Sequence, residues 1–388
     1  MSPIRLPPPP AALTKRLLTV GPVPPEWGGR LRGGVTRFHV TLLEELRTRP
    51  WRHRIEPVGV LIPPPQRIHR RIAARLAPLP IFMPPRGGRP RRFTRLLLAE
   101  QRPDVVLVNN LAAFNGARYL NVQAQVAPKL PAVGVVHEWR AILAKDDAER
   151  AARYRTAAQA ALDHVAAVVF PSRHTEAVGR DELGLRYPER APVIPNPLQP
   201  AFADPELRVD GRRHGIAFVG SYNDRKNPQA LLRALAGLPG LELTLQGRGP
   251  TEEKLRELAR ELGIDDRVDF APFLGHRRHV AAIVAQMRSA ELLCLPSRSE
   301  AFALVIVEAL AAGTPVAGYG PTLVEIRDRL GIDVGEPIFD PTPDNVAAAI
   351  EAVRSRSWDR EALRRAALAG FAPRVVAGQY ARLLREVG

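Results

Sequence analysis

Short runs of aliphatic and β-branched residues alternate with helical stretches along the whole chain, and this alternation constrains the fold most strongly. The first half has predicted strands at Leu17–Val20, Pro57–Leu61, Val105–Asn109, Ala132–His137 and Val165–Phe170. The second half has them at Gly215–Val219, Leu241–Leu245, Val268–Phe270, Leu292–Leu295 and Thr314–Ala317. The helical stretches are Val35–Leu46, Arg92–Gln101, Asp146–His164, Pro228–Leu238, Thr251–Leu262 and Ala303–Ala312. Alternating strands and crossover helices are typical of parallel sheets, so we predict an α/β fold.

A proline-rich segment divides the chain. Residues 192–200 contain four prolines, which cannot continue a helix or a central strand, so we interpret them as an interdomain linker. A length of 388 residues also fits two domains better than one. We predict a disordered tail at 1–13, domains at 14–195 and 196–370, and a C-terminal helix at 371–388 that could pack back on the N-terminal domain. A cleft between the carboxyl ends of two such sheets would bind the ligand.

Charge is unevenly distributed. The chain has 56 Lys+Arg and 40 Asp+Glu, a formal net charge of +16. Residues 1–200 hold 31 basic and 15 acidic residues, so the whole excess lies there. This excess indicates a polyanionic partner: an anionic membrane surface, a phosphorylated acceptor or nucleic acid. The single Cys294 excludes an internal disulfide and a cysteine-cluster metal site, and cytoplasmic residence is the simplest interpretation.

The basic residues are densest between Gln66 and Arg95, where nine arginines occur without an acidic residue. Ile68, Ile72 and Leu76 recur there at every fourth position. A basic face beside an apolar stripe predicts peripheral binding to an anionic membrane, with about 1 kcal/mol from each cation near the surface. The alternative is a solvated helix that packs on its own sheet.

The most informative motif runs from Cys294 to Val316 and reads CLPSRSEAFALVIVEALAAGTPV. Its order is strand, loop, helix and turn, and Glu308 is the one polar residue of the helix. A buried carboxylate needs a partner, which could be purely structural or a ligand hydroxyl. Glu300 stands at the helix entrance, where an anion could bind the backbone amides of Phe302, Ala303 and Leu304.

Residues 296–316 resemble the signature of retaining nucleotide-sugar glycosyltransferases, above all glycosyltransferase family 4, whose GT-B fold has two Rossmann-like domains facing each other across a cleft. The family has two glutamates separated by seven residues, matched here by Glu300 and Glu308. The resemblance implies that Glu300 lies by the donor sugar and Glu308 by the ribose. The chain departs from the family at Ala301 and Ala303, where glycine is usual or frequent.

The resemblance continues upstream of this motif. Residues 215–228 are similar to the family's first strand and loop of the C-terminal domain, and Lys226 matches a lysine that contacts the donor diphosphate. Ser221 stands where the family usually has arginine, and Arg225 or Arg248 could substitute for it. In isolation, Lys226 would be interpreted as a solvated loop residue.

Three further segments match the family. Residues 246–250 resemble a stretch near the nucleotide, and the loop around Phe273 would then lie near the nucleobase. Gly33 and Gly34 resemble the glycine loop before the first helix. His137, at a predicted strand end, matches a histidine that contacts the donor sugar, although a lone histidine is more often structural.

The resemblance implies a retaining transferase that moves a sugar from a nucleoside diphosphate sugar to a cell-envelope lipid or polysaccharide precursor. Glu300, His137 and Lys226 would be its catalytic residues, and the protein would act in the cytoplasm or at the inner face of the cell membrane. The sequence has no Asp-X-Asp triplet, so we expect no metal site and no cofactor.

Two alternatives stay open. A non-catalytic relative that binds nucleotide sugars is compatible with Ser221, Ala301 and Ala303. A nucleic-acid-binding protein is compatible with the basic half, but that half has no recognition helix, finger or aromatic-rich strand platform. We therefore expect no nucleic-acid partner.

Overall fold

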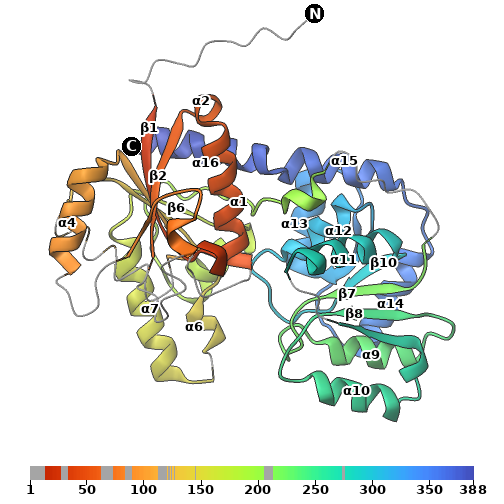
Figure 1. Ribbon diagram of the computed structural model, residues 1–388. Coiled ribbons are helices and arrows are strands. Elements are labelled where there is room, and N and C mark those ends of the chain that lie inside the picture. Colours follow the sequence, from red (N-terminus) through yellow and green to blue (C-terminus); the bar gives the residue numbers. More distant parts are fainter. Residues whose placement is uncertain are drawn as a thin grey trace, which may run out of the picture. The chain divides into compact units, whose positions relative to one another are not determined.

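The computed structural model describes residues 14–27, 34–62, 73–83, 90–111, 120, 123, 125, 127–144, 146–204, 213–272 and 276–388. The chain forms two compact units, residues 1–197 together with 373–388, and residues 198–372. Each unit has its own six-stranded parallel sheet with helices packed around it, as Figure 1 shows. The predicted α/β fold with parallel sheets is confirmed.

In the first unit the strand order is β3-β2-β1-β4-β5-β6. The strands are β1 (Lys15–Val20), β2 (Ile55–Leu61), β3 (Ile81–Phe82), β4 (Val105–Asn109), β5 (Ala132–Val135) and β6 (Ala167–Val169). The helices are α1 (Gly34–Thr48), α2 (Pro50–His53), α4 (Pro90–Gln101), α6 (Arg140–Leu143), α7 (Ala148–Leu162), α8 (Arg173–Ala177) and α16 (Pro373–Val387). A 3-10 turn lies at Pro25–Trp27 and a π-helical turn at Val178–Glu182. The central strands are apolar because helices cover both faces of a parallel sheet.

The last helix, α16, closes the core of the first unit. Its Tyr380 is fully buried, and its ring lies 5.5 Å from the ring of Phe38 on α1. The guanidinium of Arg385 donates a hydrogen bond to the backbone carbonyl of His53 at the end of α2. Residues 373–388 therefore complete a core whose other elements come from the start of the chain.

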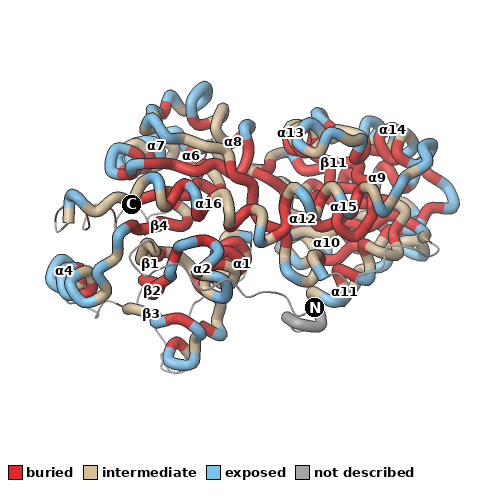
Figure 2. Tube along the Cα trace, turned by 90° about the horizontal axis from the view of Figure 1, so that it is seen from above, coloured by how far each residue is buried: buried red, intermediate tan, exposed pale blue. Residues whose placement is uncertain are grey.

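In the second unit the strand order is β12-β11-β10-β7-β8-β9. The strands are β7 (Ile216–Val219), β8 (Leu243–Gln246), β9 (Val268–Ala271), β10 (Leu292–Leu295), β11 (Val316–Tyr319) and β12 (Gly335–Ile338). The helices are α9 (Pro228–Ala236), α10 (Glu252–Glu261), α11 (His276–Ser289), α12 (Leu304–Ala311), α13 (Gly320–Leu330), α14 (Pro343–Arg354) and α15 (Arg360–Phe371). Two 3-10 turns lie at Pro200–Phe202 and Asp265–Arg267. The central helix α12 is buried almost throughout, as Figure 2 shows, whereas the outer helices have one exposed face.

All ten predicted strands are present, with some shifts at their ends. The strand predicted to end at His137 ends at Val135 instead, so His137 lies in the loop beyond β5. The strand predicted at Thr314–Ala317 begins only at Val316, because the turn that ends α12 extends through Thr314. Two strands were not predicted from the sequence: β3, which has two residues, and β12, whose sequence GEPI lacks the β-branched run of a typical strand. The predicted tail at 1–13 lies outside the described residues.

Candidate functional site

Three loops at the carboxyl edge of the second sheet bring the predicted donor-binding residues together. They follow β7, β8 and β10, which are neighbours in the sheet. The amide of Arg298, in the loop after β10, donates to the backbone carbonyl of Arg225, in the loop after β7, over 2.8 Å. In open parallel sheets this edge is where ligands bind.

Glu300 is the centre of a buried ion cluster at this edge. Only 7% of the residue is exposed, and its Oε1 lies 2.5 Å from Nζ of Lys226. Its other oxygen, Oε2, accepts a hydrogen bond from Nη1 of Arg225 over 3.2 Å. The same Arg225 nitrogen also donates to the carbonyl of Ser299 over 3.0 Å. Two cations around one carboxylate give the cluster an excess positive charge, which favours an anionic ligand.

The protonation of Glu300 follows from this arrangement. Burial acts to raise the pKa of Glu300, because it disfavours the charged form, but the charges of Lys226 and Arg225 outweigh burial and lower the pKa below its ordinary value. Glu300 is therefore a carboxylate at neutral pH. In that state it accepts hydrogen bonds and has no proton to give, which suits it to orient hydroxyl groups.

Two glycines hold the loops after β7 and β8 in contact. A Cβ atom at Gly247 would lie 1.8 Å from the carbonyl oxygen of Gly220, and one at Gly249 would lie 1.9 Å from that of Tyr222. The backbones are joined by hydrogen bonds from Gly220 to Gln246 and from Tyr222 to Arg248, of 3.1 and 2.8 Å. Residues 246–250, which resemble a family stretch, thus support the loop that carries Lys226.

Helix α12 begins at the cluster with an unusual backbone conformation. Ala303, its N-cap residue, has φ 53° and ψ 67°, in the left-handed region that favours glycine. The first backbone hydrogen bond of the helix runs from Ile306 to Ala303, so the amides at Phe302–Leu304 precede the helical ladder. The ring of Phe302 packs 5.8 Å from that of Phe371 in the core, so Phe302 offers a ligand its backbone only.

We expect the Ala303→Gly substitution to stabilise the protein by about 1 kcal/mol, because it relieves the left-handed strain of an alanine. Ala301 is the matched control, because its φ is not positive. Ala301→Gly should destabilise slightly, since glycine only adds unfolded-state entropy there. Urea unfolding of both variants measures the difference, and equal effects of the two substitutions would contradict the explanation.

The remaining predicted donor-binding residues of the second unit differ in exposure. Glu308 lies on α12 with 2% of the residue exposed, and the residue interacts with other groups of the protein. Ser221 and Arg248 are exposed in the loops after β7 and β8. Arg225, predicted as a substitute for the arginine missing at Ser221, is bound to Glu300. Phe273 lies outside the described residues.

The first unit has a second polar cluster, at the carboxyl edge of its own sheet. His137 follows β5, and its Nε2 lies 2.6 Å from Oδ1 of Asn109, the last residue of β4. His39 on α1 is fully buried, and its Nδ1 lies 2.9 Å from the carbonyl oxygen of Pro22. Gly34 is the exposed first residue of α1, and Gly33 lies outside the described residues. His39 and Asn109 were not predicted as site residues, although a polar residue that ends an apolar strand was a signal for Asn109.

Both histidines of this cluster are neutral. Burial lowers the pKa of His39 to about 4, against the raising effect of the hydrogen bond to Pro22. Burial, together with the nearby His39, lowers the pKa of His137 to about 3. The ring of Phe38 meets the His137 ring edge-on at 4.8 Å and adds to its apolar surroundings.

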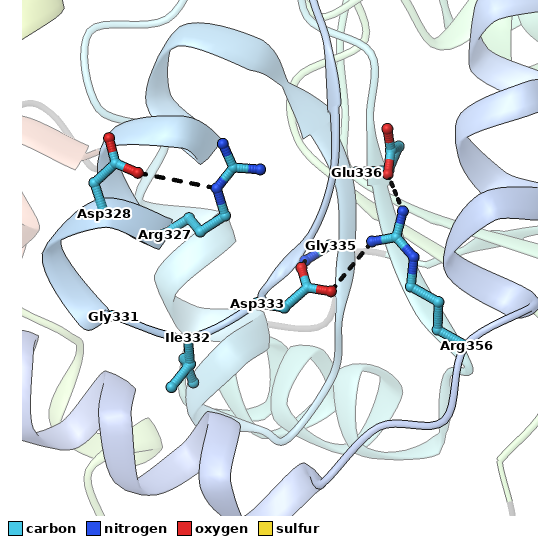
Figure 3. A pocket seen from close by; sticks show the side chains of 8 residues that line it. All are labelled: Arg327, Asp328, Gly331, Ile332, Asp333, Gly335, Glu336 and Arg356. Carbon is cyan, nitrogen blue, oxygen red and sulfur yellow. Dashed lines mark hydrogen bonds and ion pairs between the residues drawn. The ribbon is translucent and has the colours of Figure 1, made fainter.

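A cavity of about 450 Å³ elsewhere on the second unit does not fit the predicted chemistry. Figure 3 shows it between the end of α13 and the amino end of β12, away from the carboxyl ends of the strands. Its Arg356 is neutralised by Asp333 and Glu336, and Arg327 lies 4.0 Å from Asp328. Such paired charges have little attraction for a diphosphate. Within the described ranges, no three His, Cys, Asp or Glu side chains are grouped as metal ligands.

The basic stretch is described in part, over residues 73–83 and 90–95. On α4 the residues Arg91, Arg92 and Arg95 are exposed, and so is Leu96, at 61%. Leu76, upstream of α4, is 80% exposed. Exposed leucines thus accompany the arginines. Among the described residues, no helix has the length and apolar character needed to cross a bilayer.

Comparisons with known proteins match the chain to two glycosyltransferase family models. The model described as glycosyltransferase family 4 matches residues 32–202, and that described as glycosyl transferases group 1 matches residues 202–367. A D-inositol 3-phosphate glycosyltransferase of Mycobacterium bovis (strain BCG / Pasteur 1173P2) is 38% identical over 175 residues, which are 42% of this chain and 35% of that protein. One from Mycobacterium sp. (strain JLS) is 40% identical over 154 residues, 36% of this chain and 34% of its own. The match thus spans about a third of the length of these curated relatives.

Solved structures extend the similarity to the whole fold. Anabaena Alr3699/HepE, solved in complex with UDP, has a TM-score of 0.70 at 18% identity and covers 96% of this chain and all of its own. The lipopolysaccharide outer core galactosyltransferase WaaB in its apo form has a TM-score of 0.69 at 15% identity, covering 96% of this chain and 99% of its own. At these identities the likeness establishes the fold alone, and the predicted GT-B architecture is confirmed.

Proposed function

Because the chain belongs to the family 4 glycosyltransferases and has their GT-B fold, we propose that it transfers a sugar from a nucleoside diphosphate sugar to an acceptor. The observation that carries the proposal is the buried cluster of Glu300, Lys226 and Arg225 at the carboxyl edge of the second sheet. It combines cations for a diphosphate with a carboxylate for hydroxyl groups. The solved relative in complex with UDP supports a nucleotide at this kind of fold.

The chemistry is divided among the residues of this edge. Lys226 and Arg225, with the amides at the start of α12, stabilise the negative charge that the diphosphate gains as the bond to the sugar breaks. Glu300 accepts hydrogen bonds from hydroxyls of the transferred sugar. Glu308, in the next turns of the buried helix, would accept from the ribose. The contacts of Lys226, Arg225 and the helix amides strengthen as negative charge develops on the leaving diphosphate, and this differential binding lowers the barrier.

The finer features of the reaction belong to the proposal as well. We expect transfer with retention of the anomeric configuration and without a divalent metal or another cofactor, since cationic side chains and helix amides serve the diphosphate. His137, neutral and at a strand end, would contact the transferred sugar. The acceptor would be a glycan or lipid-linked precursor of the cell envelope.

The basic stretch points to where the reaction takes place. The exposed arginines of α4, with Leu96 and Leu76, match an anionic bilayer surface in charge and in apolar character. The protein would then act in the cytoplasm, bound peripherally at the inner face of the cell membrane. A phosphorylated lipid acceptor at that surface would satisfy the same charges.

A donor screen tests the proposed function. The full chain is incubated with UDP-, GDP- and ADP-sugars, with and without anionic lipid vesicles, and the released nucleoside diphosphate is measured. We expect turnover with one donor, stimulation by the vesicles and no loss on addition of EDTA. Loss with EDTA would refute metal independence, and indifference to lipid would refute the membrane role. Tight binding of UDP without any turnover would favour the non-catalytic alternative.

A further inference from the structure

In the polar cluster of the first unit, backbone pairing and close packing hold the side chain of Asn109 next to His137. β4 and β5 pair in parallel with Asn109 opposite Val135, so His137 emerges two residues beyond that pair. Gly21 fits closely against the cluster, because a Cβ atom there would lie 2.7 Å from Cβ of Asn109 and 3.1 Å from Cε1 of His39. The side chain of Asn109 is therefore held on several sides.

The hydrogen bonds determine which nitrogen of His137 carries the hydrogen. The amide nitrogen of Asn109 donates to the carbonyl of Val35 at the start of α1, over 3.3 Å, which orients the Asn109 amide. Oδ1 of Asn109 then faces Nε2 of His137 at 2.6 Å and can only accept. Nε2 therefore carries the hydrogen. In a neutral ring this leaves Nδ1 with a lone pair and no hydrogen.

We propose that Asn109 is a positioning residue, which fixes His137 in the Nε2–H tautomer so that Nδ1 accepts a hydrogen bond from a hydroxyl of the transferred sugar. This inference rests on the proposed function and adds the group that sets the polarity of the histidine. Nδ1 of His137 has no partner among the described residues, so it is available to a ligand. His39, a second titratable residue of the cluster, is neutral, and its Nδ1 lies against the carbonyl oxygen of Pro22.

The tautomer makes the histidine a selective group. A nitrogen that only accepts binds a hydroxyl and gains nothing from a sugar that lacks it, so a deoxy donor would leave Nδ1 unpaired. Sites that hydrogen-bond a substrate hydroxyl discriminate strongly against analogues without it. In the opposite tautomer, or with both nitrogens protonated, Nδ1–H would donate to the hydroxyl oxygen instead of accepting from it, so the direction of this hydrogen bond would be reversed.

Three variants of the full chain test the inference. Asn109→Leu removes the acceptor with little change in volume, and His137→Gln keeps a donor near the Nε2 position but removes Nδ1. With the donor of the screened panel that supports turnover, each should lower kcat/KM about tenfold, mainly through the KM for the donor. The double variant should lose no more kcat/KM than either single variant, because both substitutions remove the same interaction. Gln159→Leu on α7 is the matched control, since it also removes a hydrogen-bonded side-chain amide of the first unit.

A conservative variant adds a pH signature. Asn109→Asp keeps an acceptor oxygen for Nε2–H, but its charge stabilises the doubly protonated ring. Activity should approach that of the unmodified protein at high pH and fall as the pH drops through the raised pKa of His137. A merely structural asparagine would give no such profile.

Nitrogen-15 NMR of the histidine rings reads the tautomer without any substrate, with His137→Gln identifying the signal. We expect a protonated Nε2 in the unmodified protein and a mixture of tautomers in Asn109→Leu. A protonated Nδ1 in the unmodified protein, or full additivity of the two substitutions, would overturn the inference. If the tautomer is as expected but the protein turns over no nucleotide sugar, the proposed function fails while the positioning of His137 by Asn109 stands.

Discussion

Replacing Lys226 by methionine is expected to lower kcat for sugar transfer by about 10²- to 10³-fold. The substitution keeps the length and most of the apolar stem of the side chain and removes the ammonium group that lies 2.5 Å from Glu300. Removal of one preorganised charge-stabilising donor from an active site typically has an effect of this size. Steady-state release of nucleoside diphosphate measures it. Lys254→Met, which removes an exposed lysine of α10, should leave kcat unchanged.

The same substitution also perturbs folding, and a second change separates the two effects. Without Lys226, the buried Glu300 keeps one cationic partner, Arg225, so its pKa should rise and the protein should lose stability. Adding Glu300→Gln removes the buried carboxylate charge that has lost a partner and should recover part of that stability. Activity should stay low in the double variant, because both proposed catalytic groups are gone. Recovery of activity together with stability would show that Lys226 acts only through folding.

Much of the second unit's site could be predicted because it lies within short stretches of sequence. The apolar run that forms α12, stopped by Gly313, determines where Glu300 and Glu308 stand, eight positions apart on one segment. The backbone conformation at the start of α12 could not be predicted from residue type, however. Ala303 takes a left-handed conformation that alanine rarely adopts, because the packing of a buried helix outweighs a local cost of about 1 kcal/mol.

What escaped prediction depends on contacts between distant segments. The pairing of Asn109 with His137 spans 28 positions and exists only because β4 and β5 pair in one register. Arg225 was predicted only as a possible phosphate ligand. Its hydrogen bond to Glu300 was not predicted, because it depends on the loops after β7 and β10 being adjacent. No local pattern indicates these contacts, since strand order in a parallel sheet is set by crossovers.

Mild acid is expected to destabilise the first unit by about 4 kcal/mol between pH 7.5 and pH 5. In the folded protein the pKa values of His39 and His137 lie at about 4 and about 3, whereas both are near 6.5 in the unfolded chain. Below pH 6.5 the unfolded chain therefore takes up two protons that the folded protein does not, and the free energy of unfolding falls. Each histidine contributes about 2 kcal/mol by pH 5, since a shift of one pKa unit corresponds to about 1.4 kcal/mol.

The pKa shift of the buried carboxylate Glu300 does not contribute to the stability change between pH 7.5 and pH 5, so histidines account for it. The pKa of Glu300 is lowered, so this carboxylate stays charged at pH 5 and its contribution is lost only in stronger acid. Burial also lowers the pKa values of His53 and His174, which add further effects in the same direction. Stability should accordingly be fully present above about pH 7.5 and decline progressively as the pH falls through 6.5.

A matched double variant attributes the loss to the two buried histidines. His39→Asn keeps a donor near the Nδ1 position for the carbonyl of Pro22, and His137→Gln keeps one near Nε2 for Asn109, but neither side chain titrates. Hydrogen exchange of the amides in β4 and β5 reports the stability of the first unit alone. The unmodified protein should lose protection sharply from pH 7.5 to pH 5 after correction for intrinsic exchange, and the double variant should lose far less. An equal loss in both proteins would mean that the two rings are protonated in the folded state, and a protonated His137 could not accept a sugar hydroxyl.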